Sequence, residues 1–190
     1  MWNKSLKRVC LFVISIPLTI VFNYFVIMHL LDYINYFGFK GYMISLLIQL
    51  FLWYEILVFL FDKLEKLDKY MIIIIYYLLF LCCLFARPYQ NEMIVNLNPL
   101  DVVKQFNSWH DIVIGIFNVS IFIPLVTIHS FFIKKLKCNI LICVVLSLLI
   151  EILQVIFHRG IFDICDILLY LIGIFIGVLV LRFLNSKKVR

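Results

Sequence analysis

Apolar runs long enough to cross a lipid bilayer, separated by short polar breaks, dominate this chain. A transmembrane helix needs about 20 consecutive, mainly apolar residues. Six segments come close to or meet this length, at roughly 9–31, 42–61, 70–86, 112–133, 139–157 and 163–184. The pattern predicts an all-α fold, namely a polytopic transmembrane helical bundle of about six spans.

The composition supports a membrane protein. Of the 190 residues, 65% are hydrophobic, against about 45–50% in an ordinary soluble domain, and the mean hydropathy is +1.11. The lipid bilayer is therefore an expected partner. The net charge of +6 could suggest nucleic acid, but an excess of Lys and Arg in a membrane protein usually reflects its orientation. We do not expect a nucleic-acid partner.

The basic residues separate clearly when the six spans are alternated across the bilayer. One side collects 13 of the 17 Lys and Arg residues. Because short cytoplasmic loops carry the excess of positive charge, both termini are predicted to be cytoplasmic. The loop 87–111 and a turn near residue 159 then face outward. The four basic residues on that outer side are Lys40, Arg87, Lys104 and Arg159.

The outer loop 87–111 is the longest polar break in the chain. Its segment VNLNPLDVVKQF is predicted to form a short interfacial helix that begins near Asn98 or Pro99. A loop of this length is either a plain connector with aromatic anchoring or a cover for a substrate site. The residues expected on the apolar face of the helix are Leu100, Val103 and Phe106.

A polar stripe runs along the fifth predicted span. Ser147, Glu151, Gln154 and His158 follow the spacing i, i+4, i+7 and i+11, which places them on one face of a helix. A carboxyl group inside a span is costly and usually serves a function. The simpler alternative is a hydrogen-bonded or protonated carboxyl in the helix-packing core.

A second stripe follows in the sixth predicted span, where Asp163, Asp166, Tyr170, Gly173 and Gly177 again share one face. The two glycines form a G-x-x-x-G pattern, which allows a neighbouring helix to approach closely. The two aspartates lie in the first turn of their helix. They could therefore act only as caps and as favourable charges for the helix dipole.

A tight outward turn at Arg159 and Gly160 joins the two stripes, so their polar faces can meet. A guanidinium pairs in a bidentate manner with a carboxylate or a phosphate, and Asn118 is an amide expected to be satisfied across helices. We therefore predict an outward-opening polar pocket for a polar headgroup or a peptide stem. The residues expected to line it are Glu151, Gln154, Arg159, Asp163 and Asp166, supported by Asn118 and Arg87.

The chemistry of this pocket stays open at the level of sequence. Glu151 could act as a general acid or base, which makes catalysis an alternative to simple binding. His158, Asp163 and Asp166 are of metal-ligating types, but no H-E-x-x-H or comparable spacing occurs. No metal or other cofactor is expected.

An ordered set of motifs resembles the VanZ-like family of membrane proteins. The resemblance covers roughly residues 87–182, about half of the chain. The motifs are N-L-x-P at 96–99, N-x-x-x-F-I-P-L at 118–125, E-x-x-Q at 151–154, R-G-x-F-D-I-x-D at 159–166 and G-x-x-x-G at 173–177.

This resemblance implies a role in the cell envelope. The family takes its name from a protein associated with resistance to the lipoglycopeptide teicoplanin in Gram-positive bacteria. The resemblance thus implies a multi-pass protein of the bacterial cytoplasmic membrane that lowers susceptibility to such antibiotics by binding the antibiotic or an envelope component. The alternatives are a membrane enzyme that modifies a lipid-linked wall precursor, a small transporter, and a structural membrane partner.

The resemblance also implies a division into two domains, and the chain departs from the family pattern at two positions. Residues 1–69 would be a two-span addition to a VanZ-like domain at 70–190. Where the family usually carries Asp and Asn in its last helix, this chain has Cys165 and Tyr170. A homo-oligomer could supply the further helices that a transporter would need.

Overall fold

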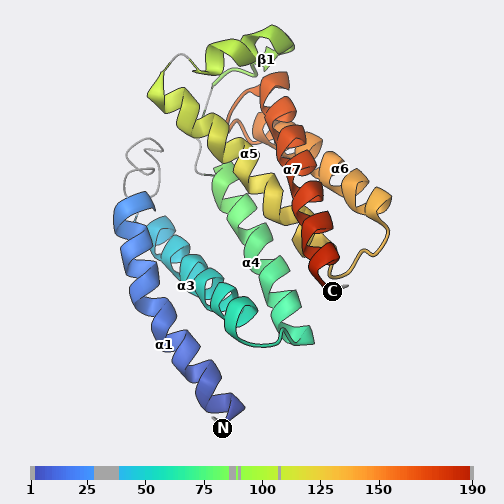
Figure 1. Ribbon diagram of the computed structural model, residues 1–190. Helices are drawn as coiled ribbons and strands as arrows, with labels where there is room; N and C mark the ends of the chain where they lie inside the picture. The colour runs from blue at the N-terminus through green and yellow to red at the C-terminus, as the bar shows by residue number, and fades with distance from the viewer. Residues whose placement is uncertain (1–2, 28–38, 86–88, 90, 107, 189–190) are drawn as a thin grey trace. The chain divides into compact units, whose positions relative to one another are not determined.

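A computed structural model describes residues 3–27, 39–85, 89, 91–106 and 108–188 of the chain. The fold is all-α, as predicted, with helices connected by short segments (Figure 1). The chain divides into two compact units. Unit 1 comprises Met1–Pro88 and unit 2 comprises Tyr89–Arg190. The predicted boundary at residue 69 remains a prediction.

The described residues of unit 1 form three long helices. Its helix α1 continues into a short π-helical segment, η1. The elements are α1 (Lys4–Phe22), η1 (Asn23–Ile27), α3 (Phe39–Phe61) and α4 (Lys66–Phe85). Leu11 of α1 packs with Leu57 and Val58 of α3 in a buried apolar cluster. This cluster forms part of the interface between α1 and α3.

Unit 2 contains three long helices, a short 3₁₀ helix and two very short strands. The elements are β1 (Val95–Asn96), η2 (Pro99–Phe106), α5 (Trp109–His129), α6 (Leu136–Ile156), β2 (Phe162–Asp163) and α7 (Ile164–Lys188). The short helix η2 confirms the predicted helix that begins near Pro99, whereas its position at the membrane interface remains a prediction. It is amphipathic in pattern, and Leu100 and Val103 are exposed on it.

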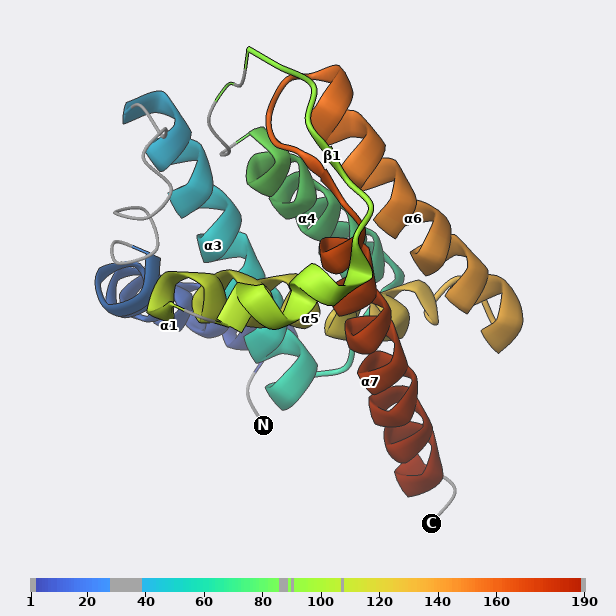
Figure 2. The ribbon, with the colours of Figure 1, turned by 90° about the horizontal axis from the view of Figure 1, so that it is seen from above.

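The two strands connect the loop 87–111 to the segment before α7. β1 and β2 pair in parallel, with Val95 opposite Phe162 and Asn96 opposite Asp163. The backbone N–H of Phe162 also donates to the carbonyl of Ile94 at 3.0 Å. Figure 2 shows β1 running beside the connection between α6 and α7. This pairing fixes the loop next to the acidic residues that open α7.

The G-x-x-x-G pattern packs α7 against α5, which confirms the close approach of a neighbouring helix. A Cβ atom placed on Gly173 would lie 2.2 Å from the carbonyl oxygen of Val119. A Cβ atom on Gly177 would lie 2.6 Å from the carbonyl oxygen of Ile123. Both distances are shorter than a non-bonded contact allows, so the backbones of the two helices meet at these positions.

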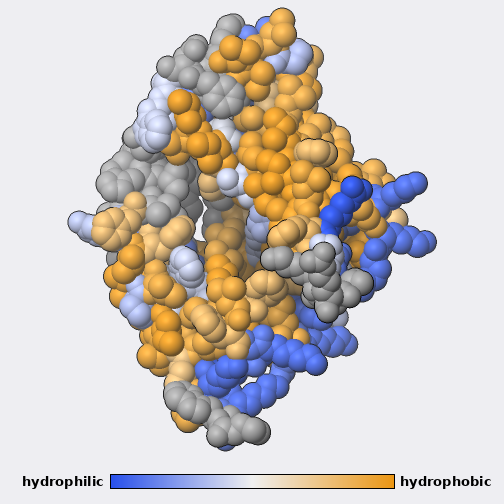
Figure 3. Space-filling view, in the orientation of Figure 1, coloured by the Kyte–Doolittle hydropathy of each residue, from blue (hydrophilic) through white to orange (hydrophobic). Residues whose placement is uncertain are grey.

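Five helical segments among the described residues are long and apolar enough to cross a membrane. They are Lys4–Phe25, Tyr42–Phe61, Asp111–His129, Leu136–Ile156 and Ile164–Ser186. Large apolar side chains are exposed along them, and Figure 3 shows extensive apolar surface. The chain is thus a multi-pass membrane protein. The span predicted at 70–86 coincides largely with α4, which is not among the five, so a sixth span and the orientation of the termini remain predictions.

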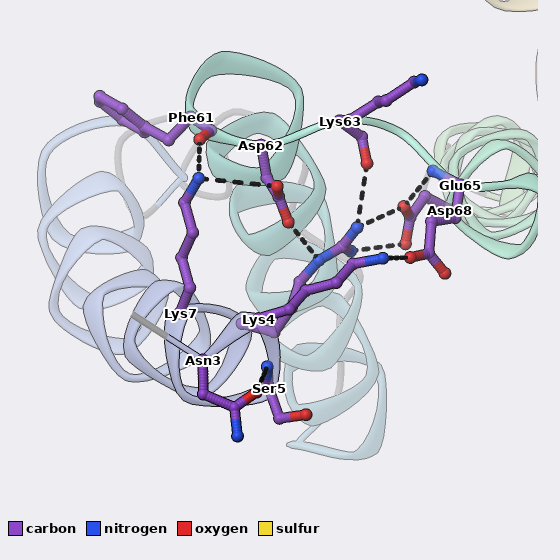
Figure 4. Close-up of polar contacts among 10 residues, drawn as sticks. Asn3, Lys4, Ser5, Lys7, Phe61, Asp62, Lys63, Glu65 and Asp68 are labelled. Carbon is purple, nitrogen blue, oxygen red and sulfur yellow. Dashed lines mark hydrogen bonds and ion pairs between the residues drawn. The ribbon is translucent and has the colours of Figure 1, made fainter. Parts of the chain in front are cut away.

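An ion-pair network joins the start of α1 to the connection between α3 and α4 (Figure 4). Arg8 donates from Nε to Asp62 at 2.8 Å, and from Nη1 and Nη2 to the two oxygens of Asp68 at 2.8 and 2.9 Å. Asp68 also accepts the backbone N–H of Glu65 at 2.7 Å, which caps α4. Lys4 pairs with Glu65.

This network makes the stability of unit 1 depend on pH. The hydrogen bond from Arg8 lowers the pKa of Asp68, and the backbone N–H of Lys63, together with Arg8, lowers the pKa of Asp62. A carboxyl whose pKa is lower in the folded state stabilises that state above its unfolded pKa, about 4 for Asp. The contribution is lost as the pH falls through the folded pKa. We therefore expect the melting temperature to fall as the pH drops below about 4.

The substitution Arg8→Met should flatten this acid dependence, because the aspartates would lose the cation that lowers their pKa. Thermal melting of the detergent-solubilised protein between pH 7 and pH 3 provides the measurement. Lys137→Met, at an exposed position in unit 2, is the control and should keep the wild-type profile. An Arg8→Met profile identical to wild type would contradict the assignment.

Candidate functional site

Glu151 is the centre of a polar network in unit 2. Its side chain is 0% exposed on α6. Its Oε2 accepts the backbone N–H of Asp163 at 3.0 Å, and its Oε1 accepts the phenolic O–H of Tyr170 at 2.9 Å. Because both oxygens have donors, the carboxyl connects the C-terminal half of α6 to the start and second turn of α7.

Asp163 precedes α7 and acts as its N-terminal cap. Its Oδ1 accepts the backbone N–H of Cys165 at 2.8 Å, a contact that satisfies one of the free donors of the first turn. The same oxygen accepts the side-chain amide of Asn96 at 3.2 Å. The capping role considered from the sequence is therefore present, and it is combined with a link to β1.

Asp166 forms the second acid–amide pair of the site. Its Oδ1 accepts from Nδ2 of Asn118 at 2.7 Å, and both side chains are buried. This hydrogen bond joins the first turn of α7 to the middle of α5 and confirms that Asn118 is satisfied across helices. A buried pair of this kind orients two helices because each polar group would be costly to leave unpaired.

The turn between α6 and α7 is sharp. The backbone N–H of Arg159 donates to the carbonyl of Gln154 at 2.8 Å. His158 has φ 53° and Gly160 has φ 154°, so two of three consecutive residues take conformations that L side chains rarely adopt. His158 lies beyond the end of α6 rather than on its polar stripe, and its ring is 5.5 Å from that of Tyr89.

The seven predicted site residues differ in how deeply they are buried. Glu151, Gln154, Asp163, Asp166 and Asn118 are buried, whereas Arg159 is partly exposed. Arg87 lies outside the described residues. Among the buried members, Asp166 bonds to Asn118, and Glu151 accepts from the backbone of Asp163. The predicted opening to the outside remains a prediction. Among the described residues, no group of three or more His, Cys, Asp or Glu side chains could hold a metal ion.

Sequence reasoning missed two contributors to buried polar structure. Asn96 was noted only as part of a motif, although it bonds the cap of α7. Glu55 was not noted at all, yet its side chain is 3% exposed within unit 1. The signal for Glu55 was available, because it is a carboxyl inside the apolar run 42–61, as Glu151 is inside 139–157.

The fold and this network define a multi-pass helical membrane protein with a buried acid–amide site. That site lies where α6 ends and α7 begins. A family model described as VanZ/LLP1 matches residues 69–185, more than half of the chain. The chain therefore belongs to the VanZ-like family, as the motifs predicted. The comparison with curated proteins found no match, and neither did the comparison with solved structures.

Proposed function

We propose that this VanZ-like protein acts in the bacterial cell envelope, at the outer surface of the cytoplasmic membrane, and lowers susceptibility to lipoglycopeptide antibiotics. It would bind the antibiotic or an envelope component at the polar end of unit 2. The observation that carries this proposal is the hydrogen-bonded network around Glu151, which brings four segments of unit 2 together. The proposed site residues are Glu151, Gln154, Arg159, Asp163, Asp166, Asn118 and Arg87.

In this proposal the buried and the accessible groups have different roles. The buried acids hold the loop and the three helices in one arrangement. Glu151 accepts from the backbone of Asp163 and from Tyr170, and the two aspartates accept from the amides of Asn96 and Asn118. Arg159 is partly exposed and supplies a cation suited to a carboxylate or phosphate on the ligand. The turn in which it sits is fixed by its backbone bond to Gln154.

The outer loop adds an apolar surface that suits an amphiphilic ligand. On η2, Leu100 is 77% exposed and Val103 is 71% exposed. Exposed apolar side chains on a short amphipathic helix favour the boundary between headgroups and acyl chains. A lipidated antibiotic or a lipid-linked precursor combines an acyl chain with a polar head, which would suit an apolar helix and a cation within the same unit.

Drug susceptibility of a Gram-positive host that expresses the chain tests the proposal. Resistance to teicoplanin should rise more than resistance to vancomycin, and Arg159→Ala and Glu151→Gln should return it to the level of the host. The exposed Lys137→Ala serves as a matched control and should leave resistance unchanged. Membrane abundance of each variant is measured in parallel, because Glu151→Gln also alters a buried network.

One outcome would contradict the proposed site, and another would favour the enzyme alternative. Unchanged resistance in both variants at normal abundance would contradict a site at these residues. Masses of the wall precursors separate binding from catalysis, since a binder leaves the precursor pool chemically unchanged. A new precursor mass that depends on Glu151 would favour the enzyme alternative, in which this carboxyl acts as a general acid or base.

A further inference from the structure

A polar seam crosses unit 1, outside the site of unit 2. On α1 and η1, Arg8, Ser15, Thr19 and Asn23 follow the spacing i, i+7, i+11 and i+15, which is a single helical face. Ser15, Thr19 and Asn23 are buried. The hydroxyls of Ser15 and Thr19 donate to carbonyls of their own helix, at 2.6 and 2.8 Å, and so are satisfied locally.

The seam continues on α3, where some polar atoms have no partner. Asn23 accepts the phenolic O–H of Tyr42 at 2.9 Å. Gln49 donates to Ser45 at 3.4 Å. Within the described part of the chain, three buried side-chain atoms of η1 and α3 make no hydrogen bond: Nδ2 of Asn23, Oε1 of Gln49 and Oε2 of Glu55.

Glu55 differs from Asn23 and Gln49 because its side chain can carry a charge. It lies seven residues before Asp62, which follows the end of α3 at Phe61. The charged groups that act on it are Asp68 of α4 and Arg8 of α1. The guanidinium nitrogens of Arg8 are directed at Asp62 and Asp68. Glu55 thus has a cation in its neighbourhood that is already engaged by two other carboxylates.

We propose that Glu55 is a proton-binding site within unit 1, which exchanges its proton at the end of the unit where Arg8, Asp62 and Asp68 lie. A buried carboxylate without a hydrogen-bond partner is costly in an apolar segment. Adding a proton to Oε2 removes the charge and turns an unsatisfied acceptor into a donor. The carboxyl then differs from Glu151, whose two oxygens both accept hydrogen bonds.

A hydrophobic carbodiimide tests this proposal on the full-length protein in liposomes. Dicyclohexylcarbodiimide adds to a protonated carboxyl, whose O–H proton moves to a nitrogen of the reagent, and peptide mass spectrometry locates the adduct. The adduct should form at Glu55 several-fold more than at Glu151 and should decrease as the pH rises. Glu55→Gln should remove it. The exposed Glu65, which pairs with Lys4, is an internal comparison and should remain unlabelled.

Three results would overturn the proposal. The first is a lack of adduct at Glu55 across the pH range while a known reactive carboxyl in the same liposomes is labelled. The second is protection by sodium at constant pH, which would indicate a metal cation in place of a proton. The third is a failure of the Glu55→Gln variant to fold. Because glutamine mimics the neutral side chain, this variant should accumulate in the membrane and elute on purification as the wild-type protein does. A collapse of this variant would indicate an ionised carboxylate with a structural partner.

Discussion

The substitution Gly173→Ala is expected to lower the free energy of unfolding by about 3 kcal/mol, the upper part of the usual range for overpacking. The added methyl group would lie 2.2 Å from the carbonyl oxygen of Val119 and 3.0 Å from Cβ of Phe122. The nearest obstacle is backbone, which cannot move aside as a side chain can. Helices α5 and α7 must therefore separate, and this loosens the contact that also holds Asn118 and Asp166 together.

Unfolding of the purified protein in mixed micelles, followed by tryptophan fluorescence, measures this effect. Gly177→Ala should also destabilise, because its new Cβ would lie 2.6 Å from the carbonyl oxygen of Ile123. Ile172→Ala, at an exposed position of the same helix, is the control and should change stability little. If Gly173→Ala proved as stable as Ile172→Ala, the close contact between α5 and α7 would be wrong.

Removal of the Glu151 carboxyl is expected to have the second large effect. In Glu151→Ala, the backbone N–H of Asp163 and the phenolic O–H of Tyr170 would both lose their acceptor in a buried site. Each unsatisfied group costs roughly 1–3 kcal/mol. Tyr170→Phe removes only one of the two bonds and should therefore cost less than Glu151→Ala.

A double-mutant cycle isolates the bond between Glu151 and Tyr170. The double variant should be less destabilised than the sum of the single variants, with a coupling energy of roughly 0.5–3 kcal/mol, the usual range for residues in contact. Tyr24→Phe, at an exposed position of unit 1, is the matched control and should show no coupling to Glu151→Ala. Strict additivity of the Glu151 and Tyr170 variants would show that the bond contributes nothing to stability.

Local patterns in the sequence were sufficient to predict much of the structure of this protein. The apolar runs determine where the helices form, because their length and composition suit the bilayer regardless of the rest of the chain. The spacing of Gly173 and Gly177 determines a face that another backbone can approach. The position of Asp163 at the start of a helix determines its capping role. Each of these features depends on residues that lie within a few turns of one another.

Contacts between distant segments were decided only by the tertiary structure. Tyr170 departs from the usual family pattern, and the sequence could not tell that its phenol donates to Glu151 on the preceding helix. The parallel pair of β1 and β2 is too short to leave a periodic signal. The choice of partner for Arg8, Glu151 or Asn118 depends on the rotation and depth of a second helix, which hydrophobic periodicity does not specify. Helical periodicity shows which face of a helix is polar, whereas the packing of the helices decides which polar groups meet.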